Sequence, residues 1–136
     1  MNVKEFLSQL HFIDQRINCK FEQMQKLRAL ATKGSATLSD INISQSKKPQ
    51  KMESTVLKII SLENEINKDI NELIDLKQKI SSMIKQVGNF ECQVLLELRY
   101  LNLKTWAQIA SEMGYSLQHI FKIHRKALKS IKILES

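Results

Sequence analysis

Residues that break helices are scarce in this sequence. Three glycines and one proline among 136 residues are too few for a β-sandwich, a β-barrel or a glycine-rich phosphate loop. No apolar run approaches the ~20 residues that a membrane-spanning helix needs, so no membrane association is expected. Apolar residues make up 43% and charged residues 26% of the chain, which is typical of a helix-rich globular protein. We therefore predict an all-α fold.

The sequence also lacks the residue groupings of a metal site or a catalytic site. Cys19 and Cys92 lie far apart and show no metal-ligand spacing, so we interpret both as reduced thiols that act as small apolar side chains. No carboxylate pair or nucleophile–base arrangement is evident, and we expect neither an enzyme nor a cofactor. The first residues, MNVKEFLSQL, lack the charged and then apolar layout of a signal peptide. The expected compartment is the cytoplasm.

Positive charge exceeds negative charge, and it is concentrated near the C-terminus. The 21 basic and 14 acidic residues give a formal net charge of +7, which favours polyanionic partners. The segment from Met113 to Leu134 contains no acidic residue and carries the cations Lys122, Arg125, Lys126, Lys129 and Lys132. A basic helix face is often only solvated, so charge alone indicates nucleic-acid binding weakly.

Two long segments carry apolar residues at heptad spacing. Residues 3–31 and 52–87 both show this pattern, which predicts two long helices with a packing seam. Residues 33–51 are rich in Ser and Lys and are predicted to form a flexible loop. An antiparallel hairpin would bury only part of the apolar face of each helix, and the apolar surface left over favours a homodimer. The alternative is a monomeric hairpin folded back on the C-terminal region. The residues expected at the oligomerisation seam are Leu10, Ile17, Met24, Ile59, Ile66, Leu73 and Ile80.

Gly88 and Asn89 interrupt the second long segment and divide the predicted domains. Gly suits the left-handed residue that follows a helix end, and Asn can cap the next helix. We predict a helical hairpin over residues 1–88 and a helix-turn-helix domain over residues 89–136. The first short helix is expected over residues 90–101, with an inner face formed by Phe90, Val94, Leu95, Leu98 and Leu101.

Local signals after this helix predict a helix-turn-helix. Thr105 is an expected N-cap, and Gln108 three residues later completes a capping box. The helix that they open is expected over residues 106–113. Gly114 then supplies a turn residue that tolerates positive φ, and Ser116 is expected to cap the next helix. This spacing is typical of a motif whose second helix enters the major groove of DNA.

The helix over residues 116–128 is the expected DNA reader. Ile120, Ile123, Ala127 and Leu128 are expected to face inward, and the 3.6-residue period then fixes the outward positions. The side chains expected to read bases are Leu117, Gln118, His119, Phe121, Lys122 and Arg125. The side chains expected to contact phosphates are Lys104, Thr105, Ser116, Lys126 and Lys129.

Two interpretations of the aromatic residues in this region differ in their consequences. Phe121 can touch a thymine methyl group, or it can pack on Leu117 or the first helix of the domain. His119 and His124 are five residues apart and share no helical face suited to a metal, so we interpret both as polar surface or DNA contacts. Trp106 is interpreted as a core residue that closes the three-helix unit.

The run TWAQIASEMGYSLQHIFKIHRKALKSI, residues 105–131, resembles the last DNA-binding region of bacterial sigma factors. The shared residues are Ile109, Ala110, Gly114, Ser116, Ile120, Ala127 and Leu128. With the lead-in LRYLNLKTW and the ending HRKAL, the region is similar to the ArpU/RinA-like regulators of late phage genes in Gram-positive bacteria. This resemblance implies a phage or prophage transcriptional regulator, acting in a bacterial host cell on double-stranded DNA, with host RNA polymerase as a further expected partner.

The sigma-like reading positions fall on Leu117, Gln118, His119 and Lys122, where sigma factors commonly carry arginine and glutamate. We therefore do not expect this chain to recognise the promoter sequence that sigma factors bind. Two other functions remain open. A small terminase subunit would combine a similar motif with a helical hairpin, usually in the reverse order. A coiled-coil protein–protein interaction module would use the long helices alone.

Overall fold

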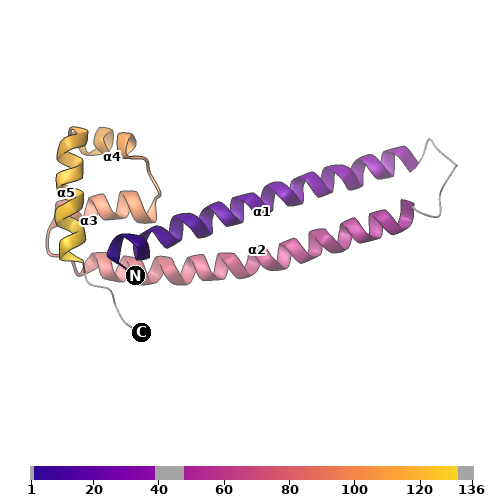
Figure 1. Cartoon of the computed structure of the whole chain (residues 1–136), viewed down its shortest axis with the longest axis horizontal. Helices are drawn as coiled ribbons and strands as arrows, with labels where there is room; N and C mark the ends of the chain where they lie inside the picture. The colour runs from indigo at the N-terminus through magenta and orange to yellow at the C-terminus, as the bar shows by residue number, and fades with distance from the viewer. Residues whose placement is uncertain (1, 39–47, 132–136) are drawn as a thin grey trace. The chain divides into compact units, whose positions relative to one another are not determined.

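The fold is all-α, as the sequence predicts. The structure is a computed structural model that describes residues 2–38 and 48–131 (Figure 1). A long antiparallel pair, α1 (Val3–Leu38) and α2 (Lys48–Lys85), is followed by three shorter packed helices. These are α3 (Phe90–Leu96), which continues into the π-helical turn η1 (Glu97–Leu101), then α4 (Trp106–Met113) and α5 (Leu117–Ser130). No helix in the described ranges is long and apolar enough to cross a membrane.

Both long helices extend further into the predicted loop than the sequence indicates. The prediction of a loop over residues 33–51 is wrong at both ends, because α1 continues to Leu38 and α2 begins at Lys48. Gly34 is accommodated inside α1 at a cost of about 1 kcal/mol relative to alanine. Pro49 lies in the first turn of α2, where the backbone N–H that proline lacks would have no helical partner. The predicted flexibility of residues 39–47 concerns a segment outside the described residues.

The end of α2 is formed differently from the prediction. The helix ends at Lys85, and the N–H of Val87 bonds back to the carbonyl of Ile84 at 3.0 Å, which tightens the last turn. Gly88 does not adopt positive φ, so the expected left-handed residue is absent there. The side-chain amide of Gln93, one turn into α3, donates instead to the carbonyl of Val87. Asn89 caps α3 as predicted, accepting from the N–H of Cys92 at 3.0 Å.

Contacts divide the chain into two compact units. Unit 1 contains residues 1–14 and 72–136, and unit 2 contains residues 15–71. The division falls inside both long helices rather than at Gly88, where the sequence analysis divides the domains. The short helices therefore belong to one unit with the first turns of α1 and the last turns of α2.

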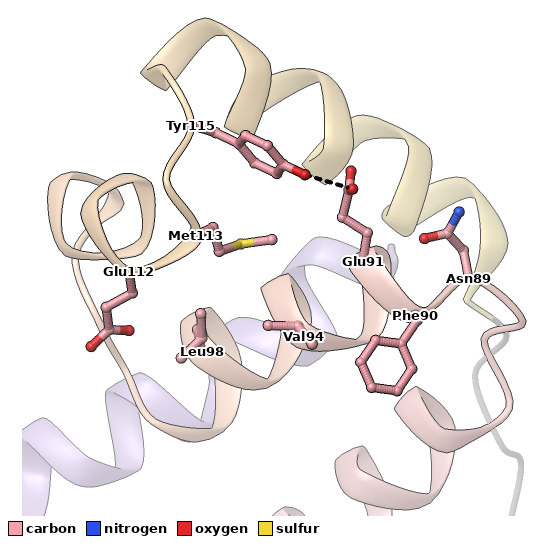
Figure 2. Close-up of a pocket in the computed structure, with 8 residues that line it drawn as sticks. All are labelled: Asn89, Phe90, Glu91, Val94, Leu98, Glu112, Met113 and Tyr115. Carbon is pink, nitrogen blue, oxygen red and sulfur yellow. Dashed lines mark hydrogen bonds between the residues drawn. The ribbon is translucent and has the colours of Figure 1, made fainter.

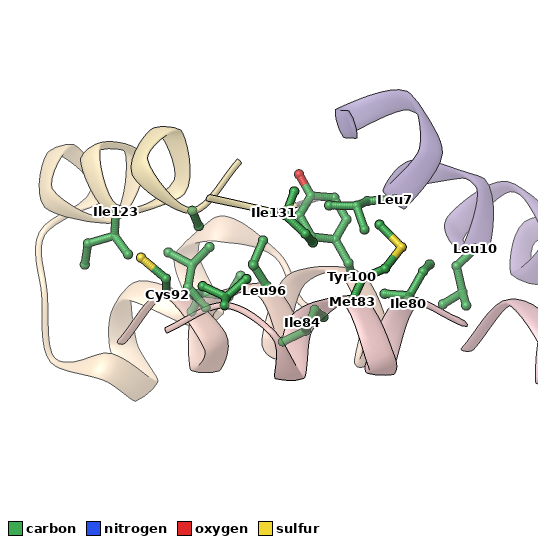
Figure 3. Close-up of a cluster of buried hydrophobic side chains, with 14 of the residues drawn as sticks. Leu7, Leu10, Ile80, Met83, Ile84, Cys92, Leu96, Tyr100, Ile123 and Ile131 are labelled. Carbon is green, nitrogen blue, oxygen red and sulfur yellow. The ribbon is translucent and has the colours of Figure 1, made fainter. Parts of the chain in front are cut away.

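Unit 1 is built around one hydrophobic core (Figure 3). Leu7 and Leu10 of α1 are fully buried together with Ile80 and Ile84 of α2. The same cluster continues without interruption into the short helices through Cys92, Leu95, Leu96, Tyr100, Ile109, Ile120, Ile123, Ala127 and Ile131. Full burial of each aliphatic side chain contributes roughly 1.5–3 kcal/mol. The helices that form the turn motif are thus fixed by apolar contacts to the first turns of α1 and the last turns of α2.

Unit 2 is an antiparallel helix pair with a narrow apolar seam and a buried ion pair. Ile17 and Met24 of α1 and Ile66 of α2 are buried. The carboxylate of Asp69, buried beside this seam, accepts hydrogen bonds from Lys20 at 2.7 Å and from Arg16 at 3.0 Å. The bond from Lys20 lowers the pKa of the Asp69 carboxyl, against the opposing effect of burial, and Arg16 lowers it further. This pairing specifies the register of the two helices.

The residues expected to join two chains pack within one chain. In unit 1 this places Leu10 and Ile80 in the core, with Leu73 half-buried beside it. In unit 2 the seam residues Ile17, Met24 and Ile66 are buried, and Ile59 is half-buried. The apolar side chains that α2 leaves exposed in unit 2 are a different set, Val56, Leu57 and Ile60. They form one patch, because residues three and four apart are neighbours on a helix.

Candidate nucleic-acid interface

Backbone geometry at the turn matches the local signals in the sequence. Thr105 and Gln108 form the predicted capping box at the start of α4, each side chain bonding the other residue's N–H. Gly114 ends α4 in the left-handed conformation, with φ of 72°. Ser116 caps α5 by accepting from the N–H of His119 at 3.2 Å. Helix, short turn and helix therefore follow one another at the predicted residues.

A hollow of about 740 Å³ lies between α3 and the turn (Figure 2). Tyr115, in the turn, donates from its hydroxyl to the carboxylate of Glu91 on α3 at 2.9 Å, and this bond ties the turn to α3. Glu112 lies on the same hollow. Two carboxylates on this side of unit 1 make it a poor surface for DNA.

The predicted inner face of α3 is wrong at Phe90. This ring is 80% exposed at the hollow, where half-buried Val94 and Leu98 also lie. Leu95 is buried as predicted, and α3 and η1 also bury Cys92, Leu96 and Tyr100. Cys92 acts as a small apolar residue, as expected, and burial raises the pKa of its thiol. Cys19 is exposed and does not act as one.

The inward face of α5 agrees with the prediction and contains one further residue. Ile120, Ile123 and Ala127 are buried and Leu128 is half-buried. His124, which the sequence analysis places on the polar surface, is buried with 7% of its side chain exposed. The reason is a partner for its ring: Nε2 of His124 lies 2.5 Å from the hydroxyl of Tyr100, which is itself buried. A buried imidazole is stable where its nitrogen is hydrogen-bonded.

Charge and burial both keep this histidine neutral. Burial lowers the pKa of His124 to about 4, and the positive charges of Lys4 and Arg99 contribute in the same direction. Burial raises the pKa of Tyr100 to about 12. The two groups are therefore an uncharged imidazole and an uncharged phenol at neutral pH, joined inside the core that holds α5.

The outward face of α5 exposes every side chain that the sequence analysis assigns to base reading. They are Leu117, Gln118, His119, Phe121, Lys122 and Arg125. Lys126 and Lys129, assigned to phosphates, are exposed on the same helix. The helix carries four cations and no acidic residue from Leu117 to Ser130. It can therefore present hydrogen-bond donors and positive charge to a polyanion.

The contact recorded for the Phe121 ring is with α4, whereas the packing partners expected from the sequence are Leu117 and the first helix of the domain. Phe121 is 39% exposed, and its ring contacts the ring of Trp106 on α4 edge to face, with centroids 5.3 Å apart. Trp106 is half-buried and packs against the core, as expected. The guanidinium of Arg99 lies 4.4 Å from the centre of the Trp106 ring.

The remaining phosphate candidates lie at helix starts. Thr105 and Ser116 are exposed N-caps, so each places a hydroxyl at the positive end of a helix dipole. Lys104 is half-buried, and its ammonium pairs with Glu112. A phosphate at Lys104 would compete with this carboxylate.

No metal site is evident in the ranges that the structure describes, where no three His, Cys, Asp or Glu side chains gather closely enough to hold an ion. Sequence reasoning missed the His124–Tyr100 pair and the role of Gln93. A signal existed for the first, because position 124 lies one residue from inward-facing Ile123 and four from Ile120, on the buried side of the helix.

Together these features define a class of protein, a helical hairpin joined to a compact helix-turn-helix with a basic outer helix. The chain belongs to the family described as "Protein of unknown function (DUF1492)", whose model matches residues 32–132, or 101 of the 136 residues. The matched region includes all of α2 to α5. No curated protein and no solved structure matches the chain.

Proposed function

We propose that this chain is a sequence-specific DNA-binding protein that regulates transcription of phage or prophage genes. The observation that carries the proposal is the outer face of α5, a capped helix after a left-handed Gly114 turn that exposes four cations and no acid. Helices in this position of a helix-turn-helix enter the major groove. The resemblance to ArpU/RinA-like regulators supports late-gene activation as the biological role.

Individual side chains on this face have distinct tasks in the proposal. Gln118 lies in the first turn of α5 and pairs with adenine, and Lys122 one turn later pairs with guanine. Arg125, Lys126 and Lys129 lie further along the helix, where they contact bases or neutralise phosphates. The acidic hollow with Glu91 and Glu112 repels DNA, and we assign it to protein partners such as host RNA polymerase.

Binding-site selection from phage DNA fragments, followed by fluorescence anisotropy on the selected duplex, tests this proposal. Lys122→Glu should weaken binding at least tenfold, because a base contact worth ~1–3 kcal/mol is replaced by repulsion. Lys58→Glu is the matched control, since it changes the net charge equally at an exposed position of α2. Equal losses in the two variants, or no selected duplex, would refute the proposal.

We also propose that two copies bind together, on half-sites about one helical turn apart or a multiple of it. The predicted seam residues pack within one chain, so we assign contact with a second copy to the exposed patch of Val56, Leu57 and Ile60. Light scattering should give the mass of two chains. A mass of eight or more chains would favour a small terminase subunit instead.

A further inference from the structure

A second cavity, of about 380 Å³, lies in unit 1 beside the start of α4. One wall is formed by the first turns of α1, and the other by η1 and the segment that leads into α4. The charged or chargeable side chains that line it are Lys4, His11 and Arg99. Among the lining residues there is no aspartate and no glutamate. The cavity is therefore suited to an anion.

The basic side chains of the lining lie on α1 and η1. Lys4 and His11 are seven residues apart on α1, which places them two turns apart on one face, and both are exposed. Arg99 is held by two contacts: its guanidinium lies over the ring of Trp106, and Nη1 donates to the carbonyl of Lys104 at 2.9 Å. Arginine carries five N–H donors. Within the described residues, the structure records no ion pair for Lys4 or for Arg99.

The segment between η1 and α4 is held in an uncommon shape. Leu103, which lines the cavity, has a positive φ of 56°, a conformation that costs a residue with a Cβ roughly 1–2 kcal/mol. The N–H of Lys104 bonds to the carbonyl of Leu98 at 3.0 Å and secures this turn. The turn delivers Thr105, an exposed hydroxyl at the positive end of α4, to the rim of the cavity.

The positive charges of this cluster act on a neighbouring side chain, that of His124. After burial, the charges of Lys4 and Arg99 are the causes that lower the pKa of His124. Both cations therefore act on the interior of the helix-turn-helix from the cavity side. An anion placed between them would be attracted by both.

One aromatic contact links the cavity to the proposed reading face. Trp106 lines the cavity, and its ring meets Phe121 of the outward face of α5. A DNA duplex that occupies α5 would therefore have its backbone near Trp106. Phe12, 65% exposed, and Lys4 also line the cavity, so it is accessible to an anion from solvent.

We propose that this cavity binds a backbone phosphate of the DNA duplex, so that the first turns of α1 form part of the DNA interface. The inference rests on the proposed function and adds a contact that the helix-turn-helix residues alone do not supply. Lys4 neutralises the phosphate, Arg99 donates hydrogen bonds to its oxygens, and the N-terminus of α4 adds its dipole. Such a contact positions the duplex without reading its sequence.

Fluorescence anisotropy between ~50 and ~200 mM salt tests the inference, with Lys4→Gln compared with Lys58→Gln. Loss of one phosphate contact should reduce the slope of log K against log[salt] by about 0.9. The affinity of Lys4→Gln should fall roughly three- to tenfold, by the same factor on the selected duplex and on an unrelated one. Lys58→Gln should retain the wild-type slope, and circular dichroism should show equal helix content in all three proteins.

The outcomes separate this inference from the proposed function. If Lys4→Gln keeps the slope of Lys58→Gln while Lys122→Glu still weakens binding at least tenfold, the cavity takes no DNA phosphate and the reading face stands. If the wild-type protein binds no duplex, the proposed function and the inference fail together. Trp106 is the only tryptophan, so its emission reports occupancy of the cavity. If a nucleoside monophosphate saturates the change in emission, while Lys4→Gln binds the duplex as tightly as the wild type, the ligand of the cavity is a free phosphate ester and not the DNA backbone.

Discussion

Replacement of His124 by glutamine should remove most of an acid sensitivity that this one residue gives the protein. The imidazole is buried on α5 against the hydroxyl of Tyr100, and burial lowers its pKa to about 4. In the unfolded chain the pKa is ordinary, about 6.5. The amide of glutamine can still bond to the Tyr100 hydroxyl, but it does not titrate. His124→Gln therefore separates protonation from the loss of a hydrogen bond.

The sign and size follow from proton linkage. Between about pH 6.5 and pH 4 the unfolded chain binds the proton and the folded chain does not, so acid favours unfolding. The stability contributed by the neutral histidine is complete above about pH 6.5 and is lost as the pH falls toward 4. With these two pKa values, the loss between pH 7 and pH 5 is about 2 kcal/mol for this group alone.

Urea unfolding at pH 7 and pH 5, followed by circular dichroism, measures this quantity. All other titratable groups are the same in both proteins, so their contributions cancel in the difference between wild type and variant. The wild-type free energy of unfolding should fall by about 2 kcal/mol more than that of His124→Gln. Equal losses in the two proteins would show that His124 titrates as an exposed residue and would refute its burial.

Two pairs of substitutions test other parts of the fold. Gly114→Ala should lower the free energy of unfolding by about 1 kcal/mol, because Gly114 has φ of 72° and only backbone strain opposes the new methyl group. Gly88→Ala should stabilise slightly, since that glycine also has open space around it but no positive φ; urea titration that ranks the two variants equally would contradict the turn geometry. Asp69→Ala should cost about 2 kcal/mol, less than a fully buried pair because Arg16 and Lys20 keep 49% and 19% of their side chains exposed. Glu63→Ala breaks a pair that is 54% and 45% exposed, and thermal unfolding should show a loss below about 1 kcal/mol.

The elements with local chemical signals are the ones that the sequence predicts to the residue. The capping box at Thr105, the helix over Trp106–Met113 and the cap at Ser116 all depend on residues three or four apart. The left-handed conformation of Gly114 also follows from a local signal, a glycine just after the end of a helix. Such features require no knowledge of the tertiary structure.

Features that depend on distant partners were not predictable in the same way. The segment from Phe90 to Leu101 is apolar on more than one face, so its periodicity cannot choose between the stripe of Phe90 and the stripe of Cys92 and Leu96. Packing against α5 decides, and it exposes Phe90. Burial of His124 likewise depends on Tyr100, which lies 24 residues earlier. The role of residues 4–12 in a cavity beside α4 has no local signal at all.

The shared core of unit 1 has a consequence for the order in which the chain folds. Leu7 and Leu10 lie in one cluster with Ile120 and Ile131, so the core cannot be completed until both ends of the sequence are present. During synthesis on the ribosome, the first turns of α1 cannot complete their packing until α5 has been made. Pairing of residues 15–71 lowers the entropic cost of this closure, because the bond between Arg16 and Asp69 joins residues 53 apart in the sequence and shortens the loop that remains to be closed. We therefore expect that weakening the Asp69 pair slows refolding, in addition to lowering stability.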